Sequence, residues 1–322
     1  MNDMSSHRRR LWLDTDPGFD DWMAWALLEA HPDIDLLGIS VVSGNAPLEI
    51  TLRNALQIRD FHGWNTPVHA GADRPLGQDR VTAQDVLGEQ AMNTVMRRLP
   101  QTQSTPNGLD GVGALIDAVR AHPGEVSVLA IGPLTNLALA FERAPDLPDL
   151  IHQLIIMGGS TDRGNTTAVA EFNIHADPEA AQLVLGGNSS LERLAIHLFG
   201  LNACRQIQVN GNHVMAVRNF GTESAQVFAD HLQAYVNISA QRGGQSMAVY
   251  DPTPVAWLLH PYLFELSPAR VDVELVGQLT RGMTVCEFRV PSKAQANAQV
   301  ALQANGHAIM EALIPLLKSV LA

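Results

Sequence analysis

The chain has 322 residues, of which 46% are hydrophobic and 17% are charged, and its formal net charge is −12 at pH 7. This composition is typical of a globular protein with a large core, and the negative charge argues against nucleic acid or an anionic membrane as the main partner. The sequence contains two cysteines, Cys204 and Cys286, and therefore neither a disulfide framework nor a zinc motif, so we expect inert thiols in a cytoplasmic protein.

The amino-terminal residues 1–9 carry basic side chains but no apolar run of the kind found in signal peptides. We therefore expect a disordered tail over residues 1–9 and a single domain over residues 10–322. No stretch of the sequence has the apolar length that crosses a membrane.

Short apolar runs alternate with helical patterns along the chain. In chain order we expect a strand at 10–14, a helix at 20–30, a strand at 34–42, a helix at 47–61, irregular surface loops over 72–111, a strand at 126–131, a helix at 135–143, a strand at 151–157, a helix at 177–185, a strand at 194–199, helices at 223–241 and 251–259, a hairpin of 271–276 with 283–290, and a helix at 307–321. This order predicts an α/β fold with a mostly parallel, Rossmann-like sheet and helices on both faces.

Polar, glycine-rich turns follow four of the predicted strands: DTDPGFDD, SGN, GPLTN and GGSTDRGN. Ligands of open α/β sheets bind outside the carboxyl ends of the strands. These turns are therefore where the sequence predicts a binding site.

Four carboxylates, Asp14, Asp16, Asp20 and Asp21, lie within eight residues at the end of the first strand. One interpretation is capping of the following helix, which suits one or two of them. A second is a site for Ca²⁺ or Mg²⁺, since a hard cation offsets the repulsion between carboxylates. A third is an aspartyl nucleophile for phosphoryl transfer, although the residues after Asp16 do not continue as that motif usually does.

The segment DTDPGFDD resembles the amino-terminal signature of the nucleoside hydrolases, the inosine–uridine-preferring ribohydrolase family. Further segments resemble the same family in the same order: VVSGN, IGPLTN, MGGSTDRGNTTAVAEFNIHADPEAA, YDP and GQLTRGMTV. The resemblance covers nearly the whole chain after the tail. It implies the nucleoside hydrolase fold, a homodimer or homotetramer, and a small-molecule ribonucleoside as the partner.

The resemblance implies a Ca²⁺ ion held by Asp16, Asp21, Asp251 and the backbone carbonyl of Ile131. In such an enzyme a metal-bound water attacks the sugar, Asp16 acts as the general base, and the N-glycosidic bond is hydrolysed to ribose and free base. The predicted catalytic residues are Asp16 and Tyr250.

The same resemblance implies how the nucleoside is held. Residues expected at the 2′- and 3′-hydroxyls of ribose are Asp20, Asn45, Asn173 and Asp251, and those at the 5′-hydroxyl are Asn165 and Glu171. Met157 belongs to the same substrate-binding segment, and Phe172 is expected at the edge of the base. Because a site that binds a hydroxyl rejects analogues without it, we expect ribosides to be preferred over 2′-deoxyribosides.

Other polar residues near these motifs have structural interpretations. We expect Asp14 to fix the turn or Asn45, Asn136 to be structural, and Asp177 to cap the helix that it precedes. Glu171 and Asn173 are expected on an extended segment before that helix.

Two histidines of the family are replaced here. Tyr250 stands where inosine- and uridine-cleaving members carry a histidine taken as general acid, and Leu87 replaces a histidine of an HGE-type motif. Tyr250 is compatible with proton donation, with stacking on the base or with packing. Two alternatives therefore stay open: a hydrolase of a modified or non-canonical N-riboside, and a calcium-dependent nucleoside or ribose binder with impaired catalysis.

Overall fold

The computed structural model describes residues 8–186 and 193–322. Within these residues the main sheet has nine strands in the order β10-β9-β11-β6-β5-β4-β1-β2-β3. Its strands are β1 (Arg9–Thr15), β2 (Ile34–Val41), β3 (Val68–Ala70), β4 (Val126–Ala130), β5 (Gln153–Met157), β6 (Ile196–Phe199), β9 (Phe264–Val273), β10 (Thr284–Glu287) and β11 (Ala298–Ala304). The seven neighbouring strands β11, β6, β5, β4, β1, β2 and β3 pair in parallel. Strand β9 pairs antiparallel with both β11 and β10. A small separate sheet pairs β7 (Gln208–Asn210) with β8 (Ser246–Ala248).

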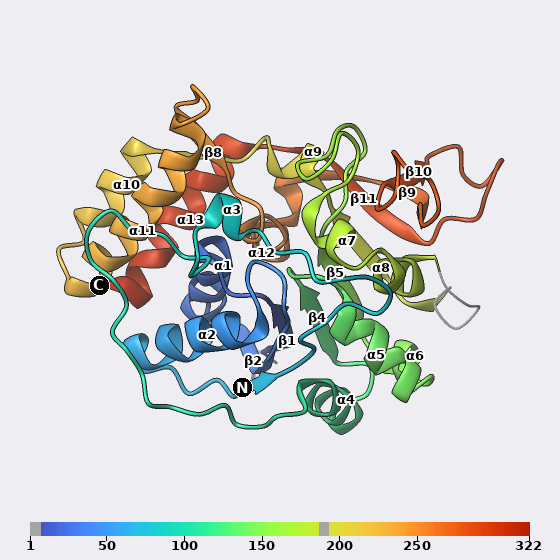
Figure 1. The fold of residues 1–322 in the computed structure, drawn as a ribbon, viewed down its shortest axis with the longest axis horizontal. Coiled ribbons are helices and arrows are strands. Elements are labelled where there is room, and N and C mark those ends of the chain that lie inside the picture. The colour runs from blue at the N-terminus through green and yellow to red at the C-terminus, as the bar shows by residue number, and fades with distance from the viewer. Residues whose placement is uncertain (1–7, 187–192) are drawn as a thin grey trace, which may run out of the picture.

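Helices cover both faces of the sheet (Figure 1). They are α1 (Phe19–Ala30), α2 (Leu48–His62), α3 (Gln84–Leu87), α4 (Gly111–Ala121), α5 (Thr135–Arg143), α6 (Leu147–Leu150), α7 (Phe172–Ala176), α8 (Pro178–Leu185), α9 (Leu201–Cys204), α10 (Gly211–Arg218), α11 (Glu223–Ala240), α12 (Pro252–Leu259) and α13 (Gly306–Leu321), with a 3₁₀ turn η2 (Pro261–Leu263). The predicted mostly parallel α/β architecture is confirmed.

The two faces follow from the alternation of side chains along each strand. On β1, Leu11 and Leu13 join the core beneath α1, α11 and α13, whereas Trp12 joins the core beneath α4, α5 and α8. On β5, Ile155 and Ile156 divide in the same way. Because both faces are buried, these strands read as continuous apolar runs rather than as alternating ones.

Sequence and structure differ where local patterns are weak. The segment 72–111 is irregular as predicted, with α3 as its one helix, but the strand β3 just before it was not predicted. The predicted hairpin exists as β9 and β10, yet β9 begins at Phe264 and also pairs with β11, which the sequence did not predict. Helices α4 and α10 were not predicted either. Residues 1–7 of the expected tail lie outside the described residues, while Arg9 already belongs to β1.

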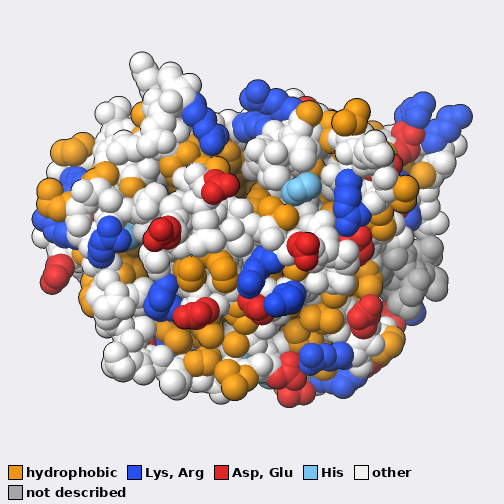
Figure 2. Space-filling model, in the orientation of Figure 1, with side chains coloured by type: hydrophobic (Ala, Val, Ile, Leu, Met, Phe, Trp, Pro, Cys, Tyr) orange, Lys and Arg blue, Asp and Glu red, His pale blue; other side chains and the backbone are white. Residues whose placement is uncertain are grey.

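The point at which the strand order reverses, where open α/β sheets form a crevice, lies beside β1. The chain runs from β1 outward to β2 and β3 on one side and from β4 to β5 and β6 on the other, so β1 and β4 are neighbours at the switch point. Open α/β sheets bind ligands at this position. Among the described residues, none of the helices is long and apolar enough to cross a membrane, and on the face drawn in Figure 2 acidic and basic side chains are interspersed.

Candidate active site

The loop after β1 is folded around the carboxylate of Asp21. Gly18 is the N-cap of α1, and Asp21 accepts a hydrogen bond from its backbone N–H at 2.8 Å, as in a capping box. The other oxygen of Asp21 accepts from the backbone N–H of Asp16 and the hydroxyl of Thr15. Helix capping therefore accounts for part of the role of Asp21, but it leaves Asp16 and Asp20 unexplained.

Asp16 lies in the crevice between the ends of β1, β2 and β4. Its side chain is 1% exposed, and its Oδ2 accepts a hydrogen bond of 2.6 Å from the backbone N–H of Asn45. The amide of Asn45 in turn donates to the backbone oxygen of Asp16 at 3.0 Å and to Asp21 at 3.1 Å. Asn45 thus ties the acidic loop to the turn after β2.

Three further carboxylates converge beside Asp16. One oxygen each from Asp20, Asp21 and Asp251 lie within 4.8 Å of one another, and all three side chains are buried. Asp251 is the N-cap residue of α12, yet its carboxylate makes no capping bond. It therefore faces the carboxylates of α1, which lie more than 200 residues earlier in the chain.

Burial raises the pKa of every carboxyl group in this cluster. The pKa of Asp16 and that of Asp251 are raised well above the usual range, first by desolvation and then by neighbouring carboxylates. The pKa of Asp20 is raised to about 7 by burial and by Asp21. A hard divalent cation fits such a set, because its ligands are carboxylate oxygens and its charge offsets their repulsion. Asp16 is not one of the three mutually close residues, although its negative charge acts on Asp251.

Asp14 was expected to fix the turn or Asn45, and its carboxylate makes no hydrogen bond to Asn45. Its carboxylate accepts hydrogen bonds from the hydroxyl of Ser40 on β2 and, at 2.7 Å, from the amide of Asn136 on α5. Asn136 also accepts from the backbone N–H of Ala72. Asp14 therefore holds β1, β2 and α5 together beneath the site, and Asn136 is structural, as expected.

The opposite wall is formed by α7 and the end of β5. Glu171 is extended, as expected, but Asn173 is not: it lies in α7, which starts where the carboxylate of Glu171 accepts the backbone N–H groups of Asn173 and Ile174. The amide of Asn173 donates to the carbonyl oxygens of Ile131 at 2.8 Å and Met157 at 3.2 Å. This leaves the Oδ1 atom of Asn173 as an acceptor, and the carbonyl of Ile131 retains its second lone pair.

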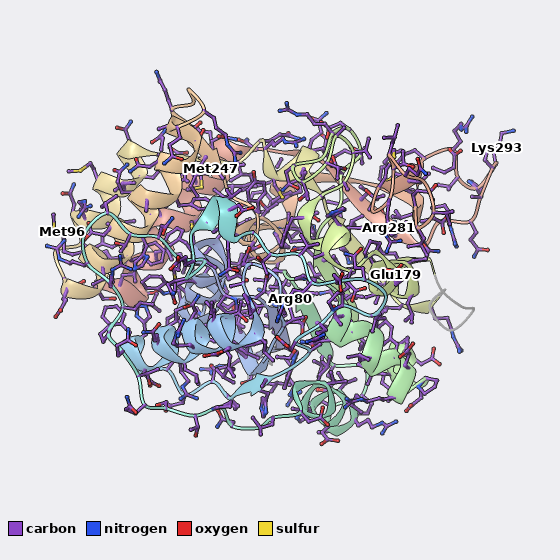
Figure 3. All side chains as sticks on the ribbon, in the orientation of Figure 1. Arg80, Met96, Glu179, Met247, Arg281 and Lys293 are labelled. Atoms are coloured by element: carbon purple, nitrogen blue, oxygen red, sulfur yellow. The ribbon has the colours of Figure 1, made fainter. Side chains whose placement is uncertain are left out.

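Asp177 caps α8, as the sequence predicts. Its carboxylate accepts from the backbone N–H of Ala180 at 3.1 Å, and it also binds the hydroxyl of Thr135 and the backbone N–H of Leu76. The chain at Leu76 is thereby attached to the start of α8. Glu179, also in the first turn of α8, forms an ion pair of 2.6 Å with Arg281 (Figure 3).

These walls enclose a cavity of about 430 Å³. Predicted site residues that line it are Asp16, Asp20, Asn45, Ile131, Met157, Asn165, Glu171, Phe172, Asn173, Tyr250 and Asp251, and Asp21 lies just beneath Asp20 and Asp251. Lining residues that the sequence did not predict are Val81, Thr82, Ala83, Asp85, Val86, Thr166, Tyr235, Arg242 and Met247. Leu87 also lines it, at the position where the family carries a histidine.

Tyr235 is the most closely engaged of the residues that sequence reasoning missed. It lies on α11, and its hydroxyl is 3.1 Å from Oδ2 of Asp20 and 3.0 Å from the carbonyl oxygen of Ala248. This contact ties α11 to the first turn of α1, on which Asp20 lies. In the sequence Tyr235 stands among apolar residues at helical spacing, a pattern that by itself predicts a core position.

Part of the cavity wall is apolar. Val81, Val86 and Leu87 line the cavity from the segment around α3, and Met247, labelled in Figure 3, also lines it. Tyr250 also lines the cavity, and burial raises its pKa to about 12. The cavity lining thus combines acidic, hydrogen-bonding side chains with apolar ones, as expected for a ligand with a polyhydroxyl part and a flat part.

Comparison with known proteins decides the family. The protein-family model described as inosine-uridine preferring nucleoside hydrolase matches residues 11–311 of this chain. The chain belongs to this nucleoside hydrolase family. The resemblance seen in the sequence motifs is confirmed, and so is the prediction of an N-ribosyl hydrolase enzyme.

Relatives of this nucleoside hydrolase cover nearly its whole length. It is 34% identical to the inosine-uridine preferring nucleoside hydrolase of Crithidia fasciculata, over 92% of this chain and 93% of that protein. It is 37% identical to the non-specific ribonucleoside hydrolase RihC of Shigella dysenteriae, over 92% and 94%. Among solved structures, the purine-preferring ribonucleoside hydrolase from Gardnerella vaginalis has a TM-score of 0.88 at 25% identity, covering 97% of this chain and 98% of that one.

Proposed function

We propose that this protein hydrolyses the N-glycosidic bond of ribonucleosides in a calcium-dependent reaction, giving ribose and free base. The observation that carries the proposal is the meeting of Asp16, Asp20, Asp21 and Asp251 at a cavity that apolar side chains also line. Acidic oxygens suit a cation and sugar hydroxyls, and the apolar side chains suit a nucleobase.

The residues proposed to hold calcium are Asp16, Asp21, Asp251 and the carbonyl of Ile131. All are oxygen donors, which is the ligand type that calcium prefers. Calcium, when bound there, supplies a positive charge that orients a water molecule and makes it more acidic.

Asp16 is proposed as the general base. Its carboxylate lines the cavity beside the other proposed calcium ligands, so it is close to a water molecule that calcium would hold. The water loses one proton to Asp16, its oxygen bonds to C1′ of the ribose, and the C1′–N bond breaks with its electron pair going to the base. Carboxylates close to the sugar also stabilise the positive charge that develops on the ring in the transition state.

The hydrogen-bonding residues that line the cavity are proposed to grip ribose. Asp20, Asn45, Asn173 and Asp251 serve the 2′- and 3′-hydroxyls, and Asn165 and Glu171 serve the 5′-hydroxyl. The Oδ1 atom of Asn173 supports this, because its amide nitrogen is engaged by backbone carbonyls while a diol needs acceptors. Met157 lies under the sugar and Phe172 at the base edge. Ribosides are therefore expected to react faster than 2′-deoxyribosides.

Tyr250 is proposed to contact the base. Because its pKa is raised to about 12, the phenol stays protonated at neutral pH and offers a hydrogen bond or an aromatic face.

The proposal is tested with Asp16→Asn, which keeps an oxygen at the metal site but removes the base. With calcium present, ribose and free base released from inosine and uridine are measured for the variant and the wild type. We expect kcat to fall by at least about 100-fold while calorimetry still detects calcium binding. The matched control is Asp117→Asn, an exposed aspartate on α4 that does not line the cavity. Near wild-type turnover by Asp16→Asn, or a wild type that binds nucleosides but releases no base, would contradict the proposal.

A further inference from the structure

The charged side chains that line the cavity are very unequal in sign. Asp16, Asp20, Asp85, Glu171 and Asp251 are acidic, and among the described lining residues Arg242 is the single lysine or arginine. No histidine is found among those lining residues either. Arg242 is therefore the one positively charged side chain that the described lining residues present to a bound molecule.

Arg242 lies directly after α11, where its backbone N–H donates to the carbonyl of Ser239 at 2.9 Å. Its side chain is exposed at the cavity mouth and, within the described part of the chain, has no ion pair or hydrogen bond. Other arginines near this face are paired, such as Arg205 with Asp162 and Arg281 with Glu179. In a chain of net charge −12, a guanidinium that lines a cavity without a partner is available for a ligand.

Asp85 is the acidic residue on the same rim, since it lies on α3, which packs near α11. No ion pair joins it to Arg242 in the described residues. The guanidinium is therefore not neutralised before a ligand enters.

The chemistry of the proposed reaction creates a need at this end of the cavity. When the C1′–N bond breaks, the base receives the electron pair and becomes negatively charged unless a proton arrives. Val81, Val86 and Leu87, which line the cavity from the segment around α3, offer the leaving base no hydrogen-bond donor from their side chains. An apolar wall also strengthens the interaction of a nearby cation with a developing negative charge.

We propose, on the basis of the proposed function, that Arg242 contacts the nucleobase and stabilises the negative charge that it gains as the glycosidic bond breaks. The guanidinium does not release its own proton. The base therefore leaves as an anion held by hydrogen bonds from Arg242 and then takes a proton from solvent. The attacking water contributes its oxygen and one hydrogen to C1′, and its other proton passes through Asp16 to solvent.

This role specifies the substrate class. Arginine forms paired hydrogen bonds with a ring nitrogen and a neighbouring carbonyl oxygen, as in its contacts with guanine. Bases that carry such a carbonyl, and whose anion spreads onto it, gain most from Arg242. Inosine is therefore expected to react faster than adenosine, whose amino group replaces that carbonyl and does not accept a hydrogen bond from arginine.

The test compares two leaving groups in Arg242→Gln and Arg242→Lys. Inosine has a poor leaving group that needs stabilisation, whereas nitrophenyl riboside has a good one that needs little. We expect Arg242→Gln to lower kcat for inosine by about 100-fold, the loss typical of one donor to a developing anion, with a much smaller loss for nitrophenyl riboside. Arg242→Lys keeps the charge and should recover part of the inosine activity, and the preference for inosine over adenosine should shrink in Arg242→Gln.

The matched control is Arg143→Gln, which removes one positive charge from an exposed pair with Asp110 and should leave both activities unchanged. Because Arg242 is exposed, the unfolding temperature of its variants should match that of the wild type. Equal losses on both substrates, or no loss on inosine, would overturn the role of Arg242 while leaving the proposed function in place. A wild type that releases no base from any riboside would instead overturn the proposed function and this role with it.

Discussion

Two glycines leave the space that the carboxylate of Asp16 occupies. A Cβ atom on Gly44 would lie 2.1 Å from Oδ2 of Asp16 and 2.7 Å from Cδ of Pro133, and one on Gly132 would lie 2.8 Å from Oδ1 of Asp16. Real Cβ atoms do not approach other atoms so closely. The turns after β2 and β4 thus pack closely against the carboxylate of Asp16, the proposed general base, and fix its position.

Gly44→Ala is therefore expected to displace Asp16 and to lower kcat by about 100-fold, the cost of misplacing a catalytic group by about 1 Å. The measurement is release of ribose from inosine, together with thermal unfolding to show that the fold persists. Gly211→Ala is the matched control, since a Cβ there meets nothing within 4 Å, and it should retain wild-type activity. Unchanged turnover in Gly44→Ala would show that the position of Asp16 tolerates the shift.

At the scale of elements, helix α1 is fixed against α2 and α11 through Trp22. The indole N–H of Trp22 donates to Nε2 of His62 at 3.0 Å, and His231 meets the Trp22 ring edge-on with centroids 5.4 Å apart. Burial lowers the pKa of both histidines to about 4. This packing holds the first turn of α1, which carries Asp20 and Asp21, against the site.

The lowered pKa of His62 predicts a loss of stability in acid. Below its ordinary pKa of 6.5 the unfolded chain binds a proton that the folded chain takes up only near pH 4, so the free energy of unfolding falls as the pH drops through this window. His62→Gln keeps an acceptor for Trp22 but does not titrate, so its free energy of unfolding should fall less steeply between pH 6.5 and 4. Urea unfolding at several pH values measures this. His152→Gln, at an exposed position, should keep the wild-type slope; an identical slope in His62→Gln would refute the argument.

At the scale of the whole molecule, the acidic cluster joins distant parts of the chain. Asp20 and Asp21 belong to α1 and Asp251 to the start of α12, on the far side of α11 in the sequence. Their raised pKa values mean that, without a cation, the folded state loses stability as the pH rises from about 4, the ordinary range of aspartate, to about 7. A bound divalent cation would offset this repulsion and link the two ends of the fold.

Calcium is therefore expected to raise the unfolding temperature at pH 7, and chelation to lower it. At a free concentration about 100 times its Kd, one ligand adds about 2.7 kcal/mol to the free energy of unfolding. Calorimetric scans with calcium, with magnesium and with chelator measure the effect, which should be larger at pH 8 than at pH 5. Asp251→Asn should lose most of it, whereas Asp117→Asn should keep it. A calcium response that survives in Asp251→Asn would place the ion elsewhere.

The candidate site was predictable to the extent that its residues stand in local motifs. Asp16, Asp20 and Asn45 follow strands that their apolar runs identify, and the carboxyl ends of neighbouring parallel strands must meet. The conformation around Glu171 was not predictable, because its carboxylate starts α7 by bonding to backbone N–H groups two and three residues ahead, a choice that the flanking pattern does not reveal. The partners of Asp14 were missed because Asn136 reaches it from α5, which is remote in sequence.

The sequence by itself determined the layered α/β class, the strands β1, β2, β4 and β5 with the turns that follow them, and the chemistry of the acidic motif, because these depend on periodicity and on neighbours along the chain. Only the tertiary structure decided that Tyr235 reaches Asp20, that Arg242 and the segment around α3 form the cavity mouth, and that β11 lies between β6 and β9. These contacts join residues far apart in sequence, and their geometry is set by the packing of whole helices and strands rather than by any local pattern.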